Sequence, residues 1–453
     1  MFKLINGDSL VELDKLGENS IDAIVTDPPY ELGFMGKSWD STGIAYNVDF
    51  WKKCLRVLKP GGHLLAFSGA RTSHRMVCAI EDAGFEIRDN IMWLYGSSMP
   101  KGQNIGKMLE AKNKYGKSNS RSLRELELSE GEGSYTVSQP NNGIMGEMKD
   151  FERRYYEPDN EWKGWNSQLK PAYEPICLAR KPLEGTIIEN INKYGVGGIN
   201  IDECRVGNEE VSTHKAPKGT FAGGELGRGS TKEEDGSINY ESHSGRYPSN
   251  VIHDGSEEAT KDMPISNSPN GSVPKVYYKE GLCDHFSKVT PFESYKDVGS
   301  ASRYYYCAKA SSKDREEGLE HFAKKQMYEG DQKFGYGNAN GDNFGDRIAN
   351  VKRTNIHPTC KPTELMQYLV RLVSPKGATI LDPFMGSGST GKAVAFENKE
   401  RDANYSFIGI EMEKEYCEIA QARIDWANDY KEEITSNVKV ERPKDLVIQE
   451  ELW

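Results

Sequence analysis

The 453-residue chain lacks any apolar run close to the roughly 20 residues that a membrane helix needs. Its first residues also lack the apolar core of a secretory signal peptide. These absences predict a cytoplasmic protein with no membrane partner. Apolar residues make up only 36% of the chain, below the usual level of about 45–50%. We therefore expect one well-packed region beside a loop-rich region.

Paired cysteines and an excess of positive charge are also missing. The eight cysteines are scattered without a C-x-x-C pair, which predicts free thiols rather than disulfides. Cys283, His285 and Cys307 do not complete a tetrahedral zinc set, so we expect no metal site. The net charge of −11 argues against binding to nucleic acid through bulk charge. It leaves room for a local basic cleft, because phosphate contacts are local.

The pattern of apolar residues divides the chain into four parts. Residues 1–95 alternate short strand-like and helix-like segments, and the same alternation returns in residues 355–428. Residues 96–354 form a polar insert, in which 169–181 is an apolar exception that we expect to return to the sheet. A charged tail follows at 429–453. Short strands alternating with helices predict an α/β fold of the Rossmann-like type with a mainly parallel sheet.

A glycine-rich loop, ILDPFMGSGSTGKA at 380–393, fits more than one nucleotide-binding pattern. Gly386, Gly388 and Gly391 have the G-x-G-x-x-G spacing of a dinucleotide fingerprint. The segment from Gly386 to Lys392 also matches most of a P-loop. A P-loop needs Ser or Thr after its lysine to bind Mg²⁺, and this chain has Ala393 there. The P-loop is therefore disfavoured.

Two carboxylates narrow the choice between the remaining cofactors. Asp382 lies just before the glycines, where it would repel a pyrophosphate but suit the cationic end of S-adenosylmethionine. Glu411 lies about 20 residues beyond the loop, where a carboxylate accepts ribose hydroxyls. Both cofactors have such a ribose, so Glu411 does not discriminate. The loop thus favours S-adenosylmethionine without excluding a dinucleotide.

The tetrapeptide Asp27-Pro28-Pro29-Tyr30 follows a buried strand and supplies the matching chemistry. An exocyclic amino group of adenine or cytosine is a poor nucleophile, because its lone pair is delocalised into the ring. The Asp27 carboxylate and the Pro28 carbonyl can accept its two hydrogens and favour attack on a methyl sulfonium. Tyr30 offers an aromatic face for an extruded base. Alone, the tetrapeptide is more typical of a proline-rich turn; beside a cofactor loop it indicates methyl transfer.

Along the chain, DPPY comes first, then the insert, and then FMGSGS. With its motifs in this order, the chain resembles the β class of amino-group DNA methyltransferases. The resemblance covers residues 1–94 and 355–423, more weakly 169–181. It is greatest to phage or prophage members, through IEDAGFEIRDNIMWLYGS, KPAYEPICLARKPLEG, GRYPSNVIHDG and HPTCKP. It implies a seven-stranded twisted sheet with helices on both faces. It also implies a location in the cytoplasm of a bacterium or of a phage-infected host.

The resemblance assigns roles by position. Asp27, Pro28, Pro29 and Tyr30 match the catalytic tetrapeptide, Asp8 a carboxylate near the cofactor adenine, and residues 357–363 the segment beside the methionine moiety. The residues implied to hold S-adenosyl-L-methionine are Asp8, Asp27, His357, Lys361, Pro362, Thr363, Asp382, Pro383, Phe384, Gly386, Ser387, Gly388 and Glu411. Many members have Val at the position of Cys360, where a small thiol should serve equally.

Double-stranded DNA is the implied substrate, with adenine N6 favoured over cytosine N4 because DPPY is commoner in adenine enzymes. Cytosine C5 chemistry would need a cysteine nucleophile, typically in a Pro-Cys pair that this chain lacks. RNA or protein-amide methylation, and a catalytically dead DNA-binding module, are remoter alternatives. A restriction partner and the choice between monomer and homodimer stay open.

The insert holds the position of the family's target-recognition region. Contact with DNA needs cations for phosphates. The candidates are Lys112, Lys114, Lys117, Arg121, Arg124, Arg153, Arg154 and Arg303. Any one of these clusters could equally be a solvated surface.

Overall fold

The structure is a computed structural model that describes residues 1–32, 38–96, 102–140, 148–214, 240–267, 298–308, 312–326 and 352–430. Cys283 and His285 lie outside these residues, as does the tail beyond 430. Within them, the α/β class and the mostly parallel sheet predicted from the sequence are confirmed. No helix in these ranges is long and apolar enough to cross a membrane.

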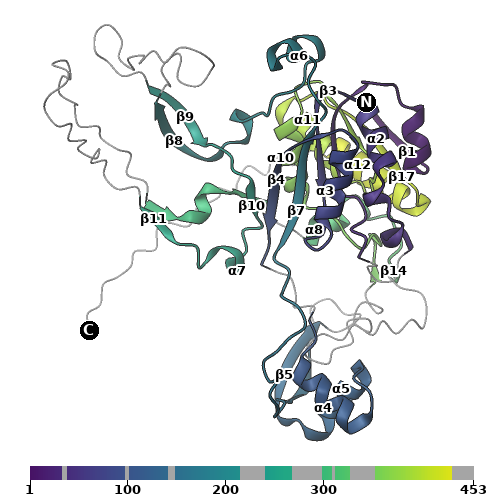
Figure 1. Cartoon of the computed structure of the whole chain (residues 1–453), viewed down its shortest axis with the longest axis vertical. Helices are drawn as coiled ribbons and strands as arrows, with labels where there is room; N and C mark the ends of the chain where they lie inside the picture. Colours follow the sequence, from purple (N-terminus) through teal and green to yellow (C-terminus); the bar gives the residue numbers. More distant parts are fainter. Residues whose placement is uncertain are drawn as a thin grey trace, which may run out of the picture.

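The central sheet has nine strands, drawn from both ends of the chain and from the insert (Figure 1). In spatial order they are β1 (Phe2–Asn6), β17 (Ser406–Glu411), β16 (Thr379–Asp382), β2 (Ile21–Thr26), β3 (Leu58–Phe67), β7 (Tyr173–Arg180), β4 (Glu86–Leu94), β10 (Val251–His253) and β13 (Tyr306–Cys307). Strand β7, from the 169–181 segment, is antiparallel to both of its neighbours, and the other pairs are parallel.

The expected count of seven strands is wrong, because the insert adds two short strands. Val251 pairs with Met92 of β4, and Ile252 pairs in turn with Tyr306 of β13. Ile252 is fully buried. Pairing of β10 satisfies backbone groups that β4 would otherwise leave exposed at an edge. The GRYPSNVIHDG segment therefore extends the sheet, which the polar composition around it concealed.

Helices cover both faces of the sheet, as alternate residues of one strand require. Val25 packs in a core with α10 (Thr363–Val373), α11 (Ser389–Arg401) and α12 (Lys414–Asp429). Its neighbour Ile24 packs on the other face with α2 (Val48–Val57) and α3 (Ser73–Asp82). Both side chains are fully buried. The sheet is thus the middle of three layers.

The insert also forms small elements away from the sheet (Figure 1). A lobe beyond the end of β4 contains α4 (Ile105–Tyr115), α5 (Ser120–Glu130) and the hairpin of β5 (Glu132–Pro140) with β6 (Met148–Tyr155). Helix α6 (Ile187–Tyr194) lies at the opposite end of the sheet. The insert also contains α7 (Glu257–Thr260), α8 (Ser312–Glu316), and the strand pairs β8 (Val206–His214) with β9 (Tyr240–Arg246), β11 (Ile265–Asn267) with β12 (Val298–Ser300), and β14 (Lys325–Gln326) with β15 (Lys352–Arg353). Outside the insert, α1 (Ser9–Glu12) follows β1.

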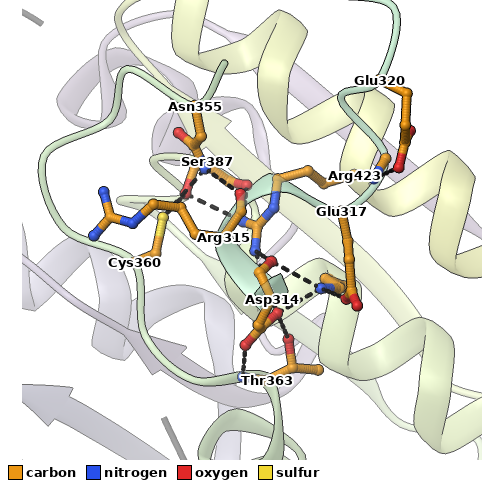
Figure 2. A network of polar contacts seen from close by, with 11 residues as sticks. Asp314, Arg315, Glu317, Glu320, Asn355, Cys360, Thr363, Ser387 and Arg423 are labelled. Atoms are coloured by element: carbon orange, nitrogen blue, oxygen red, sulfur yellow. Dashed lines mark hydrogen bonds and ion pairs between the residues drawn. The ribbon is translucent and has the colours of Figure 1, made fainter. Parts of the chain in front are cut away.

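Helix α8, near the end of the insert, contacts helices α10, α11 and α12 of the C-terminal half through Asp314 (Figure 2). The Asp314 carboxylate accepts hydrogen bonds from Thr363 N, at 2.7 Å, and from the Thr363 hydroxyl, at 2.6 Å. It also forms an ion pair with Lys392 and lies 3.7 Å from the guanidinium of Arg423. Lys392 and Arg423 are fully buried, so Asp314 neutralises charges that solvent cannot reach.

We predict that Asp314→Ala lowers the free energy of unfolding by about 3–5 kcal/mol, because it leaves buried cations without this partner. Burial acts to raise the pKa of Asp314, but the Lys392 charge and the hydrogen bonds from Lys392 and Thr363 together outweigh it, and the pKa is lowered. The stabilisation should therefore be present above the ordinary aspartate pKa and disappear as the pH falls through the lowered value. Urea unfolding at several pH values measures both effects.

The matched control is Glu415→Ala, which breaks an exposed ion pair with Lys325 and should cost under about 1 kcal/mol. Equal losses in the two variants would contradict the role given to Asp314.

Candidate active site

A cavity of about 650 Å³ opens at the edge of the sheet where β1, β17, β16 and β2 end. These four strands are neighbours and parallel, so the segments that follow them meet at one place. The predicted site residues that line the cavity are Asp8, Asp27, Pro28, Pro29, Tyr30, His357, Lys361, Asp382, Pro383, Phe384, Gly386, Ser387 and Glu411. Pro362, Thr363 and Gly388 are not part of its lining.

The glycine loop turns from β16 into α11 with two left-handed residues. Gly386 has φ +53° and Gly388 has φ +78°. A Cβ atom on Gly386 would lie 2.8 Å from His357 Nε2, and one on Gly388 would lie 2.9 Å from the Cα atom of Ala420. The Glu411 carboxylate accepts a 2.8 Å hydrogen bond from Gly386 N. Glycine is therefore required both by backbone conformation and by close packing.

Asp382 holds the two neighbouring strands together. Its carboxylate accepts hydrogen bonds from the hydroxyls of Thr26, at 2.7 Å, and Thr390, at 2.6 Å, and from Phe384 N at 3.1 Å. Burial raises the pKa of Asp382 to about 6. The sequence pointed to a ligand for this carboxylate, but not to these two threonine partners. Contact between Asp382 and a cationic cofactor stays a prediction.

Lys392, the lysine of the P-loop pattern, does not point into the cavity. It is fully buried, forms an ion pair with Asp314 and lies 2.9 Å from the Glu317 carboxylate. Its side chain also packs 5.2 Å from the centre of the Trp426 ring. A P-loop lysine must reach the phosphates, so these contacts argue against the P-loop interpretation.

The catalytic tetrapeptide places Asp27 directly after β2. Asp27 Oδ2 lies 2.6 Å from Lys361 Nζ. Asp27 Oδ1 is shielded from solvent and has no hydrogen-bond partner within the described part of the chain. Lys361 itself is 7% exposed, and its Nζ atom also lies 3.4 Å from the Glu174 carboxylate. An unpartnered carboxylate oxygen is costly, which marks Asp27 as a functional candidate.

Tyr30 is connected to the same group of charges. Its hydroxyl donates a 2.8 Å hydrogen bond to Glu174, on β7, and its backbone carbonyl accepts one from Thr72. Burial, followed by the charges of Asp27 and Glu174, raises the pKa of Tyr30 well above its ordinary value. The sequence did not identify Glu174 as a site residue. Its position in the PAYEP strand was the available signal, but a lone carboxylate beginning an apolar strand does not reveal where it points.

Comparison with known proteins identifies the family. The model of the N6/N4 DNA methylase family matches residues 21–422. The chain belongs to this family. The predicted family of amino-group DNA methyltransferases is therefore confirmed, while the β class and the likeness to phage members stay predictions.

Individual relatives match shorter stretches. The type II methyltransferase M.HindIII of Haemophilus influenzae is 24% identical over 44% of this chain and 64% of its own length. The DNA adenine methyltransferase YhdJ of Escherichia coli K12 is 38% identical over 20% of this chain and 29% of its own. The chain thus spans less than two thirds of either relative. Among solved structures, the M1.HpyAVI–SAM complex has a TM-score of 0.34 at 14% identity, covering 94% of this chain and all of the other.

The HPTCKP segment of this family member is held by the insert as well as by the glycine loop (Figure 2). Arg315 donates a 3.0 Å hydrogen bond to the His357 carbonyl, and Cys360 Sγ lies 3.0 Å from the Ser387 hydroxyl. Burial acts to raise the pKa of Cys360, but a hydrogen bond with His357 and the charge of Arg423 lower it to about 6. The segment is therefore fixed against the cavity from two sides.

The predicted DNA-binding cations fall in three places. Lys112, Lys114, Lys117, Arg121 and Arg124 are exposed on the α4–α5 hairpin. Carboxylates of α5 accompany two of them, in the pairs Lys114–Glu130 and Arg121–Glu125. Arg153 and Arg154 belong to β6 of the same lobe. Arg303 instead lies over the Tyr304 ring, at 4.5 Å, and donates a hydrogen bond to the Ser300 carbonyl.

We predict that Gly386→Ala weakens binding of S-adenosylmethionine at least tenfold, because the added Cβ collides with the His357 ring and distorts the loop. The control is Gly377→Ala, whose φ of +80° imposes similar left-handed strain but whose Cβ would meet open space. Both substitutions should lower thermal stability, because alanine is strained in a left-handed conformation. Calorimetric titration should show weakened binding in Gly386→Ala alone; equal affinity in the two variants would be the contrary result.

Proposed function

We propose that the chain transfers a methyl group from S-adenosyl-L-methionine to the exocyclic N6 of adenine in double-stranded DNA. The observation that carries this proposal is Asp27 Oδ1, an acceptor without a partner among the described residues, beside a cavity that the glycine loop also lines. Membership of the N6/N4 DNA methylase family supports the reaction type.

The residues around the cavity suit this cofactor. The strand ends supply three carboxylates, from Asp8, Asp382 and Glu411, and the loop supplies a backbone without side chains at Gly386 and Gly388. Glu411 would accept the ribose hydroxyls, and Asp8 would lie towards the adenine. When bound, S-adenosylmethionine supplies an electrophilic methyl group on a cationic sulfonium. The Asp382 carboxylate, beside the glycines, would repel the pyrophosphate of a dinucleotide, which favours the methyl donor.

The chain's own residues would orient the attacking nitrogen. Asp27 Oδ1 would accept one amino hydrogen and the Pro28 carbonyl the other. These two hydrogen bonds would weaken the conjugation of the amino nitrogen with the ring. The nitrogen lone pair would then become available for attack. The Tyr30 ring would stack on the extruded base, and the two prolines would limit movement of the loop. This is catalysis by position and electrostatics, with no covalent enzyme intermediate.

Adenine is the proposed base because the tetrapeptide begins with Asp rather than Ser, and because YhdJ, a relative, is named as an adenine enzyme. Cytosine N4 is the second candidate, since the family covers both bases. The α4–α5 hairpin is the proposed contact with phosphates. It projects beyond the end of β4 (Figure 1). Because β4 runs in the same direction as β2, this end of β4 lies at the edge of the sheet where the cavity opens.

Nucleoside mass spectrometry of DNA incubated with the protein and isotope-labelled S-adenosylmethionine tests the function and the base together. We expect labelled N6-methyladenine, and Asp27→Ala should lower the rate on the order of 10²–10³-fold or more while leaving cofactor binding nearly unchanged. Asp49→Ala, which removes an exposed carboxylate paired with Lys52, is the control and should retain activity.

If the labelled product is N4-methylcytosine, the target base is cytosine rather than adenine. Absence of label from DNA, or more than a tenth of the normal turnover in Asp27→Ala, would refute the proposed mechanism.

We also predict that DNA binding weakens steeply with salt despite the net charge of −11. Neutralising the five cations of the α4–α5 hairpin should reduce the slope by up to about one unit for each phosphate that the hairpin no longer binds. The control neutralises five exposed cations elsewhere: Lys15, Lys52, Lys193, Lys376 and Arg401. Fluorescence anisotropy at several salt concentrations gives the slopes, and equal slopes in both variants would assign the hairpin to a solvated surface.

A further inference from the structure

The catalytic carboxylate belongs to a charge cluster built from three separate parts of the chain. Asp27 follows β2, Glu174 lies on β7, and Lys361 precedes α10. The Lys361 ammonium lies between the two carboxylates, 2.6 Å from Asp27 Oδ2 and 3.4 Å from Glu174 Oε2. The charges sum to −1 at the edge of the cavity.

Aromatic rings restrict where the ammonium can move. Lys361 Nζ lies 5.3 Å from the centre of the Tyr30 ring and 4.9 Å from that of Phe67. Both distances suit a cation–π contact. Burial acts to lower the pKa of Lys361, but the charges of Asp27 and Glu174 outweigh it and raise the pKa. The lysine is therefore a fixed positive charge at every pH where the enzyme would work.

We propose that Lys361 and Glu174 are positioning residues for methyl transfer. The Lys361 ammonium binds Asp27 Oδ2, so that Oδ1 remains to accept a hydrogen bond from the target amine. Glu174 holds Lys361 on one side and the Tyr30 hydroxyl on the other, which fixes the acceptor and the stacking ring relative to each other. This assignment rests on the proposed function. It differs from the cofactor-binding role that the family resemblance implies for Lys361.

Electrostatics gives Lys361 a second effect on Asp27. The groups that face Asp27 are Lys361, Glu174, the Tyr30 hydroxyl and Asp382. Without Lys361, Asp27 would lose its ion-pair partner and still face the carboxylates of Glu174 and Asp382, which disfavours its charged form. Only the charged form has Oδ1 as an obligate acceptor. The acid side of the rate profile should therefore move to higher pH when Lys361 is removed.

The test compares Lys361→Met, which keeps most of the length of the side chain without its charge, with Lys376→Met, which breaks an exposed pair with Asp402. We measure kcat, KM for a DNA duplex, the Kd for S-adenosylmethionine by calorimetry, and the pH dependence of kcat. Lys361→Met should lower kcat on the order of 10²-fold and move the acid limb of its pH profile to higher pH. KM and Kd should change less than threefold, and Lys376→Met should match the unmodified protein.

Two further variants separate positioning from folding. Lys361→Arg retains the charge and should restore the acid limb, although its planar group should not restore the full kcat. Glu174→Gln retains the shape and an acceptor for Tyr30, and should lower kcat about tenfold through looser control of Lys361. It also carries the test if Lys361→Met does not fold.

Failure of this inference is distinguishable from failure of the proposed function. If the unmodified protein transfers no methyl group to DNA, the proposed function fails and this inference with it. If it does transfer, an unchanged kcat and acid limb in Lys361→Met and Glu174→Gln would overturn the positioning role alone. So would a tenfold or greater rise in the Kd for S-adenosylmethionine with kcat unchanged, because Lys361 would then act on the cofactor.

Discussion

Parallel pairing between β2 and β16 is the constraint on which the site depends. Ile380 pairs with Ala23, and at the ends of the same two strands the Thr26 hydroxyl binds Asp382, 356 residues away in the chain. The catalytic tetrapeptide and the glycine loop start immediately beyond this contact. Because both strands are buried and parallel, their carboxyl ends lie at one edge of the sheet, and the two loops share a cavity. A single buried hydrogen bond thus lies between the proposed catalytic acceptor and the proposed cofactor loop.

The insert takes part in this arrangement rather than interrupting it. It supplies β7, whose Glu174 reaches Lys361 and Tyr30, and it supplies α8, whose Asp314 binds the buried cations Lys392 and Arg423. These contacts bring the long excursion back to the sheet and its covering helices. The entropy cost of closing a loop grows only slowly with its length, so a few buried polar contacts can suffice to fix its ends.

Much of the fold could be predicted because strand and helix periodicity is strong at both ends of the chain. The tetrapeptide, the glycine loop and Glu411 each follow or end a predicted strand of one mainly parallel sheet, and the structure has all three at one cavity. The partners of those residues could not be predicted. Lys361 was expected at the cofactor yet contacts Asp27, and no motif indicated Glu174, because side-chain direction depends on tertiary packing. The two added strands could not be predicted either, because strands of three and two residues carry no reliable period.

A crystal structure of the protein with S-adenosylhomocysteine and a DNA duplex containing its target tests the central claim most directly. The decisive quantity is the distance from Asp27 Oδ1 to the exocyclic nitrogen of the extruded base. We predict a hydrogen bond of about 2.7–3.2 Å, with the Lys361 ammonium still bound to Oδ2 and the base stacked on Tyr30. A target amine held by other residues, with Asp27 turned away from it, would contradict the account.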